Sequence, residues 1–439
     1  MEDHSLGVRE ASGSNPDRSI MAERERGPHP TLRIKGTKSH ALSGKSIVLG
    51  VTGSIAAVKT VELARELIRH GADVYGVMSE AATEIIHPYT LHYATGHDVI
   101  TKLMGNIEHV EFLGMEGSAD LFIIAPCTAN TLNKIAGGVS DTPVTAFATT
   151  AFGSGIPIIV VPAMHETMYK NPILIANRDK LRKLGVTVLG PRFDEGLAKI
   201  VSTEDIILAV EHVLSPKKLA GKRILITGGP TIEPIDPIRI LTNRSSGRTG
   251  IELAKEAYKQ GAEVTLVHSK ELNLEEGIKE VKVETAREMI DTCVTELREG
   301  KEKEEGYDVL VSSAAISDFT ADSSETKILS GEDFYLHLVP TGKLIDEVKR
   351  EFPELVIVGF KAETNVSEEE LIRKAREKMD DHNIEMVVAN DVGNGGIGTE
   401  ENEVYIIRKG AEDAGVKHVK GVKSLIAEEI MDELAKISL

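Results

Sequence analysis

One strand–helix–strand pattern occurs twice in the 439 residues and constrains the fold more than any other feature. In the first copy an apolar run, Lys45–Gly53, precedes a segment with helical spacing, and a second apolar run follows at Ala72–Met78. Segments 62–74 and 252–264 have nearly the same sequence, either through duplication or because such units look alike. Short continuous apolar runs are typical of buried parallel strands. The pattern therefore predicts an α/β fold with two doubly wound, Rossmann-like domains.

The chain is too long for one ordinary hydrophobic core, which agrees with two domains. Residues 1–43 are rich in Ser, Gly, Pro, Arg and Glu, and we expect a disordered extension there, with Met21 as an alternative first residue. The first domain then spans 44–214 and the second spans 222–439. A linker at 215–221 joins them.

Composition narrows the environment and the partners. The chain has 41% hydrophobic residues and no apolar stretch long enough to span a bilayer, so we expect no membrane segment. A formal charge of −18 argues against general binding of nucleic acid. The two cysteines, Cys127 and Cys293, cannot form a disulfide framework. These features favour a cytoplasmic protein.

Both glycine-containing loops lack the spacing of a dinucleotide site. The first has Gly50, Gly53 and Ala56, and the second has Gly228 and Gly229 followed by proline. The backbone at Gly53 and the hydroxyl of Ser54 nevertheless suit one phosphate at a helix N-terminus. In the second copy, residues 229–247 are inserted where ligands bind in open α/β sheets.

Two further apolar runs end in residues that could bind a ligand. Residues 121–131 end in Thr128 and Asn130, which either bind phosphate or cap the following helix. The run 156–161 leads to His165 and Met168, and strand ends of this kind suit a flat cofactor. The spacing of Met164 and Met168 also fits simple packing in the core.

Taken together, these segments resemble a known family. Gly53-Ser-Ile-Ala-Ala57, His109-Val-Glu, Ala125-Pro-Cys-Thr-Ala-Asn130 and Pro162-Ala-Met-His-Glu-Thr-Met168 are similar to the flavin-dependent cysteine decarboxylases. The second half resembles phosphopantothenate–cysteine ligase in Asn243-Arg-Ser-Ser-Gly-Arg248, Ala314-Ala-Ile-Ser-Asp318 and Gly359-Phe-Lys-Ala-Glu-Thr-Asn365. The resemblance covers about 45–439 and follows the domain order of the fused coenzyme A biosynthesis proteins. It implies a flavodoxin-like first domain.

For the first domain, the resemblance implies FMN-dependent decarboxylation of 4′-phospho-N-pantothenoylcysteine to 4′-phosphopantetheine. The flavin takes a hydride from the thiol-bearing carbon, and the resulting thioaldehyde accepts the electrons that the carboxylate leaves behind. His109 would be the catalytic base. The residues expected at the cofactor are Gly53, Ser54, Ser79, Thr128 and Asn130, and those expected at the substrate are His165 and Met168.

Two positions depart from the family pattern. His165 stands where the family has an asparagine that contacts the substrate carboxylate, so an imidazole would have to make this contact. The stretch Arg192–Lys199 contains no counterpart of the cysteine that protonates the enethiolate in bacterial members. Cys127 does not align with it. The proton donor stays open between Lys199 and water.

For the second domain, the resemblance implies that CTP activates 4′-phosphopantothenate as an acyl-cytidylate, with release of pyrophosphate. The amine of cysteine then displaces CMP, and Asn243 would act in this step. Mg²⁺ is expected with the triphosphate, but no metal ligand can be assigned. The expected contacts of CTP and substrate are Ala314, Asp318, Lys327, Pro340, Thr341, Gly342, Lys343, Phe360 and Lys378.

Two other classes of protein compete with this interpretation. One is a different flavin or NAD(P) oxidoreductase, which the glycine spacing disfavours. The other is a non-catalytic flavoprotein that regulates a partner, against which His109 and Asn243 both argue. The resemblance also implies a homo-oligomer, plausibly a dodecamer, with the flavin at a trimer contact and the ligase site near a dimer contact.

Overall fold

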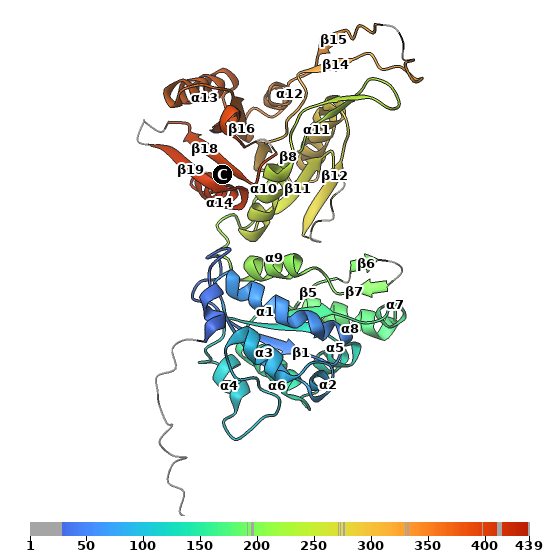
Figure 1. The fold of residues 1–439 in the computed structure, drawn as a ribbon, viewed down its shortest axis with the longest axis vertical. Helices are drawn as coiled ribbons and strands as arrows, with labels where there is room; N and C mark the ends of the chain where they lie inside the picture. The colour runs from blue at the N-terminus through green and yellow to red at the C-terminus, as the bar shows by residue number, and fades with distance from the viewer. Residues whose placement is uncertain are drawn as a thin grey trace, which may run out of the picture.

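A computed structural model describes residues 29–437, except 191, 195–196, 271, 273, 275–276, 330, 332, 397 and 411–414. Most of the expected extension, residues 1–28, lies outside this part of the chain. Figure 1 shows two α/β domains that follow one another along the chain, the first in blue to green and the second in yellow to red.

The first domain is a five-stranded parallel sheet with helices on both faces. The strand order is β2-β1-β3-β4-β5, so β1 lies inside the sheet and the chain winds outward from it in both directions. This confirms the doubly wound, flavodoxin-like prediction. The strands are β1 (Ser46–Val51), β2 (Asp73–Met78), β3 (Leu121–Cys127), β4 (Ile158–Pro162) and β5 (Thr187–Val188).

Alternation along the strands divides the core of this domain into two layers. Leu49 faces the layer that contains α1, α3 and α9, whereas Val48 faces the layer that contains α4, α5, α6 and α8. The helices are α1 (Thr60–Arg69), α2 (Glu80–Thr83), α3 (Pro88–Thr95), α4 (Glu108–Leu113), α5 (Ala129–Ala136), α6 (Pro143–Ser154), α7 (Glu166–Tyr169), α8 (Pro172–Lys183) and α9 (Thr203–Leu214). Shorter elements are η1 (Pro30–Ile34), η2 (Ile55–Lys59), β6 (Arg192–Asp194) and β7 (Leu197–Lys199).

Some of the residues before 44, where we expected the first domain to begin, are part of the first domain. Residues 30–34 form η1, Thr31 is buried, and Leu42 is fully buried in the first core layer. The expectation of disorder up to residue 43 is therefore wrong for residues 29–43. Too few apolar side chains occur there for the sequence pattern to indicate packing.

The second domain has an eight-stranded sheet in the order β12-β11-β8-β13-β16-β17-β18-β19. Its first six strands are parallel, and the antiparallel pair β18–β19 extends one edge. The strands are β8 (Arg223–Gly228), β11 (Glu263–His268), β12 (Ile278–Lys282), β13 (Val309–Ser312), β16 (Val356–Glu363), β17 (Met386–Asp391), β18 (Glu401–Arg408) and β19 (Val416–Val422). The antiparallel edge was not predicted, although the Rossmann-like core is confirmed.

Helices again cover both faces of this sheet, with α10 and α14 in one layer and α11, α12 and α13 in the other. They are α10 (Arg248–Lys259), α11 (Ala286–Glu302), α12 (Leu344–Glu351), α13 (Glu368–His382) and α14 (Lys423–Leu434). The remaining elements are β9 (Ile232–Pro234), β10 (Ile240–Thr242), β14 (Phe319–Ala321), β15 (Leu338–Pro340) and η3 (Val392–Asn394). In Figure 1, β14 and β15 extend away from the sheet.

The repeated sequence corresponds to the same structural unit in both domains. Leu63 and Ala64 of α1 are buried, as are Leu253 and Ala254 at the matching positions of α10. The two units differ in the loop after the first strand. β1 leads directly into η2, whereas β8 is followed by the antiparallel pair β9–β10 before α10 begins.

The end of α9 contacts α10 and joins the two domains. Glu211 is 7% exposed, and its carboxylate lies 2.7 Å from Nδ1 of His70 and 3.0 Å from Nζ of Lys259. Nδ1 of His212 donates to the carbonyl of Tyr258 at 2.7 Å. Leu219, in the expected linker, is also buried. No helix within the described residues is long and apolar enough to cross a membrane.

Candidate active sites

The loop after β1 forms a narrow turn against α2. A Cβ atom added to Gly53 would lie 2.6 Å from Cβ of Ala81 and 3.1 Å from its backbone, so no larger residue fits without movement of α2. The hydroxyl of Thr52 donates to the carbonyl of Pro126 at 2.8 Å and accepts from the N–H of Thr128 at 3.0 Å. These bonds hold the loops after β1 and β3 side by side.

The expected cofactor residues occupy the carboxyl ends of three neighbouring strands. Ser54, Ser79 and Thr128 follow β1, β2 and β3, and each hydroxyl caps the helix that begins there. Each hydroxyl oxygen accepts a hydrogen bond from a backbone nitrogen at 3.3 Å. The donors are the N–H groups of Ala56, Ala82 and Thr131, respectively. The exposed Asn130 lies in the first turn of α5. One edge of the sheet therefore brings all five residues, Gly53 included, together.

His165 and Met168 follow β4 at the same edge of the sheet. Nδ1 of His165 accepts from the N–H of Thr167 at 3.5 Å and lies 3.1 Å from its hydroxyl. This bond places the ring proton on Nε2 when the imidazole is neutral. Met168 is 50% exposed, so within one chain this side chain does not pack in the hydrophobic core, which was the alternative interpretation.

His109 lies apart from the other first-domain candidates. It is part of α4, which precedes β3 and packs against α6. Its ring is 6.3 Å from the ring of Phe147, and its buried Nδ1 has no hydrogen-bond partner among the described residues. In Figure 1, α4 and α7 lie at opposite sides of the first domain. One chain alone does not bring this base to the other residues.

The thiol of Cys127 is not a suitable proton donor. It is fully buried at the end of β3, and burial raises its pKa well above the usual range. Burial raises the pKa of Cys293 in the same way. The side chain of Lys199 lies outside the described part of the structure.

Asn243 is joined to the end of β13 in the second domain. Its Nδ2 donates to the carbonyl of Ala315 at 2.9 Å, and the N–H of Ala315 donates to the carbonyl of Gly229 at 2.9 Å. The N–H of Ala314 lies 3.3 Å from the hydroxyl of Thr227. Asn243 and Ala314 therefore meet at the point where the strand order reverses between β8 and β13.

A second group of expected residues adjoins this point. The N–H of Thr341 donates to the carbonyl of Asp318 at 3.0 Å, and its hydroxyl donates to the carbonyl of Ser317 at 2.5 Å. Lys343 forms an ion pair with Asp318. Pro340 and Gly342, on either side of Thr341, are exposed. The loops after β13 and β15 thus form one polar surface.

Phe360 and Lys378 are also brought together. Nζ of Lys378 donates to the carbonyl of Phe360 at 2.7 Å. Burial, together with the charges of Lys361 and Lys343, lowers the pKa of Lys378 to about 8. Sequence reasoning missed Lys361, although it stands inside the quoted Gly359-Phe-Lys motif. Lys343 and Lys361 form ion pairs with Asp318 and Glu363, whereas Lys378 has no carboxylate partner among the described residues. A buried ammonium group of this kind suits an anionic ligand.

Lys327 is exposed on a neighbouring loop. The next residue is anchored by Asp236, whose carboxylate accepts from the N–H of Ile328 at 3.1 Å. Burial raises the pKa of Asp236, but three backbone N–H groups and Arg239 outweigh this effect and hold it at about 2. Among the described contacts, none joins Lys327 directly to Asp318 or Lys343.

The second domain also has a cleft that sequence reasoning missed. It has a volume of about 580 Å³ between the start of α13 and the β18–β19 hairpin. Its walls include Asp391, Glu401, Glu403, Tyr405 and Lys420. The described residues contain no group of three or more His, Cys, Asp and Glu side chains that could hold a metal ion.

Comparison with known proteins agrees with this division of the chain. A family described as "Flavoprotein" matches residues 35–215, and one described as "DNA/pantothenate metabolism flavoprotein C-terminal domain" matches residues 219–437.

Three relatives carry the name "Coenzyme A biosynthesis bifunctional protein CoaBC". The Thermococcus kodakarensis protein is 49% identical over 93% of this chain and 99% of its own length. The Methanocaldococcus jannaschii protein is 39% identical over 93% of this chain and 98% of its own length. The Vibrio parahaemolyticus protein is 33% identical over 82% of this chain and 91% of its own length. The chain belongs to the family of coenzyme A biosynthesis bifunctional proteins, with a flavoprotein domain followed by a pantothenate metabolism domain.

Proposed function

We propose that this chain is a bifunctional enzyme that makes 4′-phosphopantetheine in two steps. The second domain joins 4′-phosphopantothenate to cysteine at the expense of CTP, and the first domain decarboxylates the product with FMN. The observation that carries the proposal is that the chain holds two complete doubly wound domains, each with its candidate residues at the carboxyl edge of the sheet. Reduced, buried cysteines agree with work in the cytoplasm.

The residues of the first domain fit FMN. The turn at Gly53 leaves no room for a side chain on the Ala81 side, and hydroxyls from three strand ends surround it. Such a turn suits one phosphate rather than the diphosphate of FAD. Bound FMN supplies the hydride acceptor that makes loss of carbon dioxide easy. The residues of the chain bind and orient the flavin and the substrate, and they move protons.

His165 would hold the carboxylate of the substrate. With its proton on Nε2, a neutral imidazole offers an N–H donor, as the NH₂ group of an asparagine also does. This replaces the missing asparagine contact without requiring a charged ring. The exposed Met168 would cover the substrate beside it.

His109 would act as the base from a second copy of the chain. The surface around it is apolar, with Met104 64% exposed, Ile107 55%, Val110 43% and Met115 86%. A contact between copies would bury these side chains and bring His109 to the flavin site of a neighbour. We therefore propose a homo-oligomer, plausibly a dodecamer.

In the second domain, the converging lysines would neutralise the triphosphate. Lys343 and Lys378 lie beside Asp318 and Phe360, and Lys327 lies on the neighbouring exposed loop. Mg²⁺ would enter with CTP. Asn243 donates to Ala315 through Nδ2, which leaves its Oδ1 to accept from the attacking amine of cysteine.

A staged reaction tests the proposal. Protein freed of flavin, supplied with 4′-phosphopantothenate, cysteine, CTP and Mg²⁺, should accumulate 4′-phospho-N-pantothenoylcysteine. Addition of FMN should then convert it to 4′-phosphopantetheine, as identified by mass. A protein that forms neither product, with or without FMN, contradicts the proposal.

A further inference from the structure

The buried carboxylate of Glu211 connects the two domains in a way that the proposed function does not use. It lies 2.7 Å from Nδ1 of His70, which caps the end of α1, and 3.0 Å from Nζ of Lys259, the last residue of α10. Glu211 itself is part of α9 and is 7% exposed. A buried carboxylate that loses a partner does not regain the solvation of water, so breaking either bond is costly. These three residues, the Glu211 contact, therefore hold the ends of α1 and α10 together.

α1 and α10 both begin at a candidate active site. α1 starts at Thr60, directly after the short helix η2 that follows the flavin-site turn, and α10 starts at Arg248, shortly after Asn243. The helices have 10 and 12 residues, so at about 1.5 Å per residue they span roughly 15 Å and 18 Å. Glu211 therefore lies far from the ligands of both sites, and a link between the sites runs through these helices.

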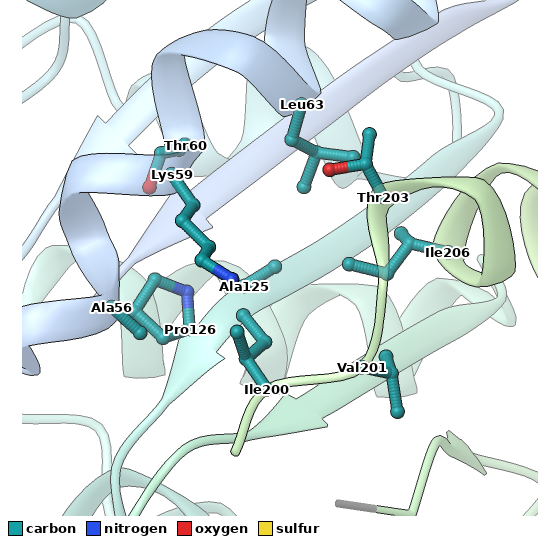
Figure 2. A pocket seen from close by; sticks show the side chains of 10 residues that line it. All are labelled: Ala56, Lys59, Thr60, Leu63, Ala125, Pro126, Ile200, Val201, Thr203 and Ile206. Carbon is teal, nitrogen blue, oxygen red and sulfur yellow. The ribbon is translucent and has the colours of Figure 1, made fainter. Parts of the chain in front are cut away.

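α9 packs against α1 near the flavin site as well as at the Glu211 contact. Figure 2 shows Leu63 of α1 with Thr203 and Ile206 of α9 around one small cavity beside the end of β3. Leu63 and Ile206 belong to the same layer of the core. In Figure 1, α9 lies between α1 and the second domain. Because a close-packed interior transmits displacements, α1 and α9 move as one unit.

The segment before β1 fixes the last turn of α1. Three of its backbone N–H groups donate to the last carbonyls of α1, which a helix leaves without internal partners. The pairs are Gly36–Ile68 at 3.0 Å, Lys38–Arg69 at 3.0 Å and Leu42–His70 at 2.9 Å. Leu42 is also fully buried. His70 therefore keeps its place relative to α1 and moves only with the whole helix.

The end of α9 holds the end of α10 equally firmly. Nδ1 of His212 donates to the carbonyl of Tyr258 at 2.7 Å, and the two rings stack with their centroids 4.2 Å apart. The hydroxyl of Ser215 donates to the carbonyl of Lys259. Nζ of Lys259 also lies 2.8 Å from the carboxylate of Glu256, so its charge is balanced on both sides. A shift of α10 along its axis would break these bonds together.

We propose that the Glu211 contact couples the two active sites, so that FMN bound to the first domain increases the affinity of the second domain for CTP. The inference rests on the proposed function. The contact has a closed arrangement, with Glu211 bound to both His70 and Lys259, and an open one in which one of these bonds is lost. FMN holds the turn before α1 and so favours the closed arrangement, which fixes α10 and the loop that carries Asn243. Because coupling free energies are reciprocal, CTP increases the affinity for FMN by the same factor.

The test measures the affinity for each ligand with and without the other. The Kd for CTP with Mg²⁺ is measured on flavin-free and FMN-loaded protein, and the Kd for FMN is measured with and without CTP. In wild type, each ligand should lower the Kd of the other by the same factor, about fivefold or more. Lys259→Met and Glu211→Gln should reduce both factors below about twofold. The matched control Lys255→Met removes a lysine of α10 outside the Glu211 contact and should keep the wild-type factor.

Amide hydrogen exchange tests the same link without CTP. FMN binds the first domain, yet it should slow exchange in α10 of the wild type and have no such effect in Lys259→Met. Coupling factors below about twofold in wild type, with no change in α10 exchange, would overturn the inference. Coupling that persists in both Lys259→Met and Glu211→Gln would overturn it too. Failure of the proposed function looks different, since the second domain would then not bind CTP, and the effect of FMN on α10 exchange would still decide the inference.

Discussion

Replacement of Gly53 by alanine tests the flavin-site turn. The new Cβ would lie 2.6 Å from Cβ of Ala81, and 3.1 Å from the carbonyl carbon and oxygen of that residue. Backbone atoms are among these neighbours, so α2 must move as a unit and cannot relieve the contact by rotating one side chain. We expect the flavin-free protein to relax by displacing α2, which carries its cap Ser79 with it.

The magnitude follows from the cost of restoring the turn when flavin binds. Overpacking of one methyl group costs about 1–3 kcal/mol. If binding requires the original position of α2, this energy is subtracted from the binding free energy, and the Kd for FMN rises roughly 5-fold to 150-fold. The assay is titration of flavin-free protein, with quenching of FMN fluorescence as the signal.

Two further variants complete this experiment. Gly105→Ala is the matched control, because a Cβ there meets nothing within 4 Å, and its Kd should equal that of wild type. Ala81→Gly removes the nearest atom, so the double variant with Gly53→Ala should recover most of the lost affinity. Binding by Gly53→Ala within twofold of wild type would refute the steric argument, as would a double variant with no recovery.

Four other predictions follow from the same contacts. His109→Asn should abolish decarboxylation while FMN binding and formation of 4′-phospho-N-pantothenoylcysteine persist; continued release of 4′-phosphopantetheine would remove His109 from its role. Asn243→Asp should still release pyrophosphate but accumulate the acyl-cytidylate, which quenched samples analysed by mass would reveal; equal loss of both half-reactions would instead indicate that the bond to Ala315 only stabilises the loop. Burial and neighbouring lysines lower the pKa of Lys378 to about 8, so this side chain loses its positive charge above that pH. CTP affinity should therefore fall as pH rises through 8. Lys378→Met should flatten this pH dependence of CTP affinity, whereas the control variant Lys303→Met should leave it unchanged. Glu211→Gln should lower the free energy of unfolding by about 1.5–3 kcal/mol at pH 7, because it weakens hydrogen bonds to charged groups. Burial opposes ionisation of Glu211, but its bonds to His70 and Lys259 outweigh this and lower its pKa. The stability advantage of the wild type should therefore be present above about pH 4.5 and be lost as pH falls below it, as denaturant titrations would show.

Much of the fold could be predicted because local pattern and tertiary packing agree in the parallel strands. The buried positions Leu63 and Leu253 recur at the same place in both repeats, and each first strand is a continuous apolar run. The antiparallel strands β18 and β19 were missed. β19 has a single buried position, Val419, and its sequence mixes three charged or polar residues, Lys417, His418 and Lys420, with Val416, Gly421 and Val422. Its stability comes from pairing with β18, which is not visible in its own sequence.

The candidate sites were predicted in part, for a similar reason. Strand ends of parallel sheets meet at one edge, so Gly53, Ser79 and Thr128 could be grouped before their positions were known. The cleft between α13 and the β18–β19 hairpin could not be found in this way, because its walls come from segments that are far apart in the sequence. The position of His109 relative to the flavin turn likewise depends on α4 packing against α6.

One measurement tests the central claim most directly. The protein, saturated with FMN and Mg²⁺, is supplied with 4′-phosphopantothenate, CTP and cysteine that carries ¹³C in its carboxyl group. The account predicts that CMP, pyrophosphate and ¹³CO₂ appear in equal amounts, together with 4′-phosphopantetheine that holds no label. Release of CMP without ¹³CO₂, or of unlabelled carbon dioxide, would contradict the claim that one chain performs both reactions on the same cysteine.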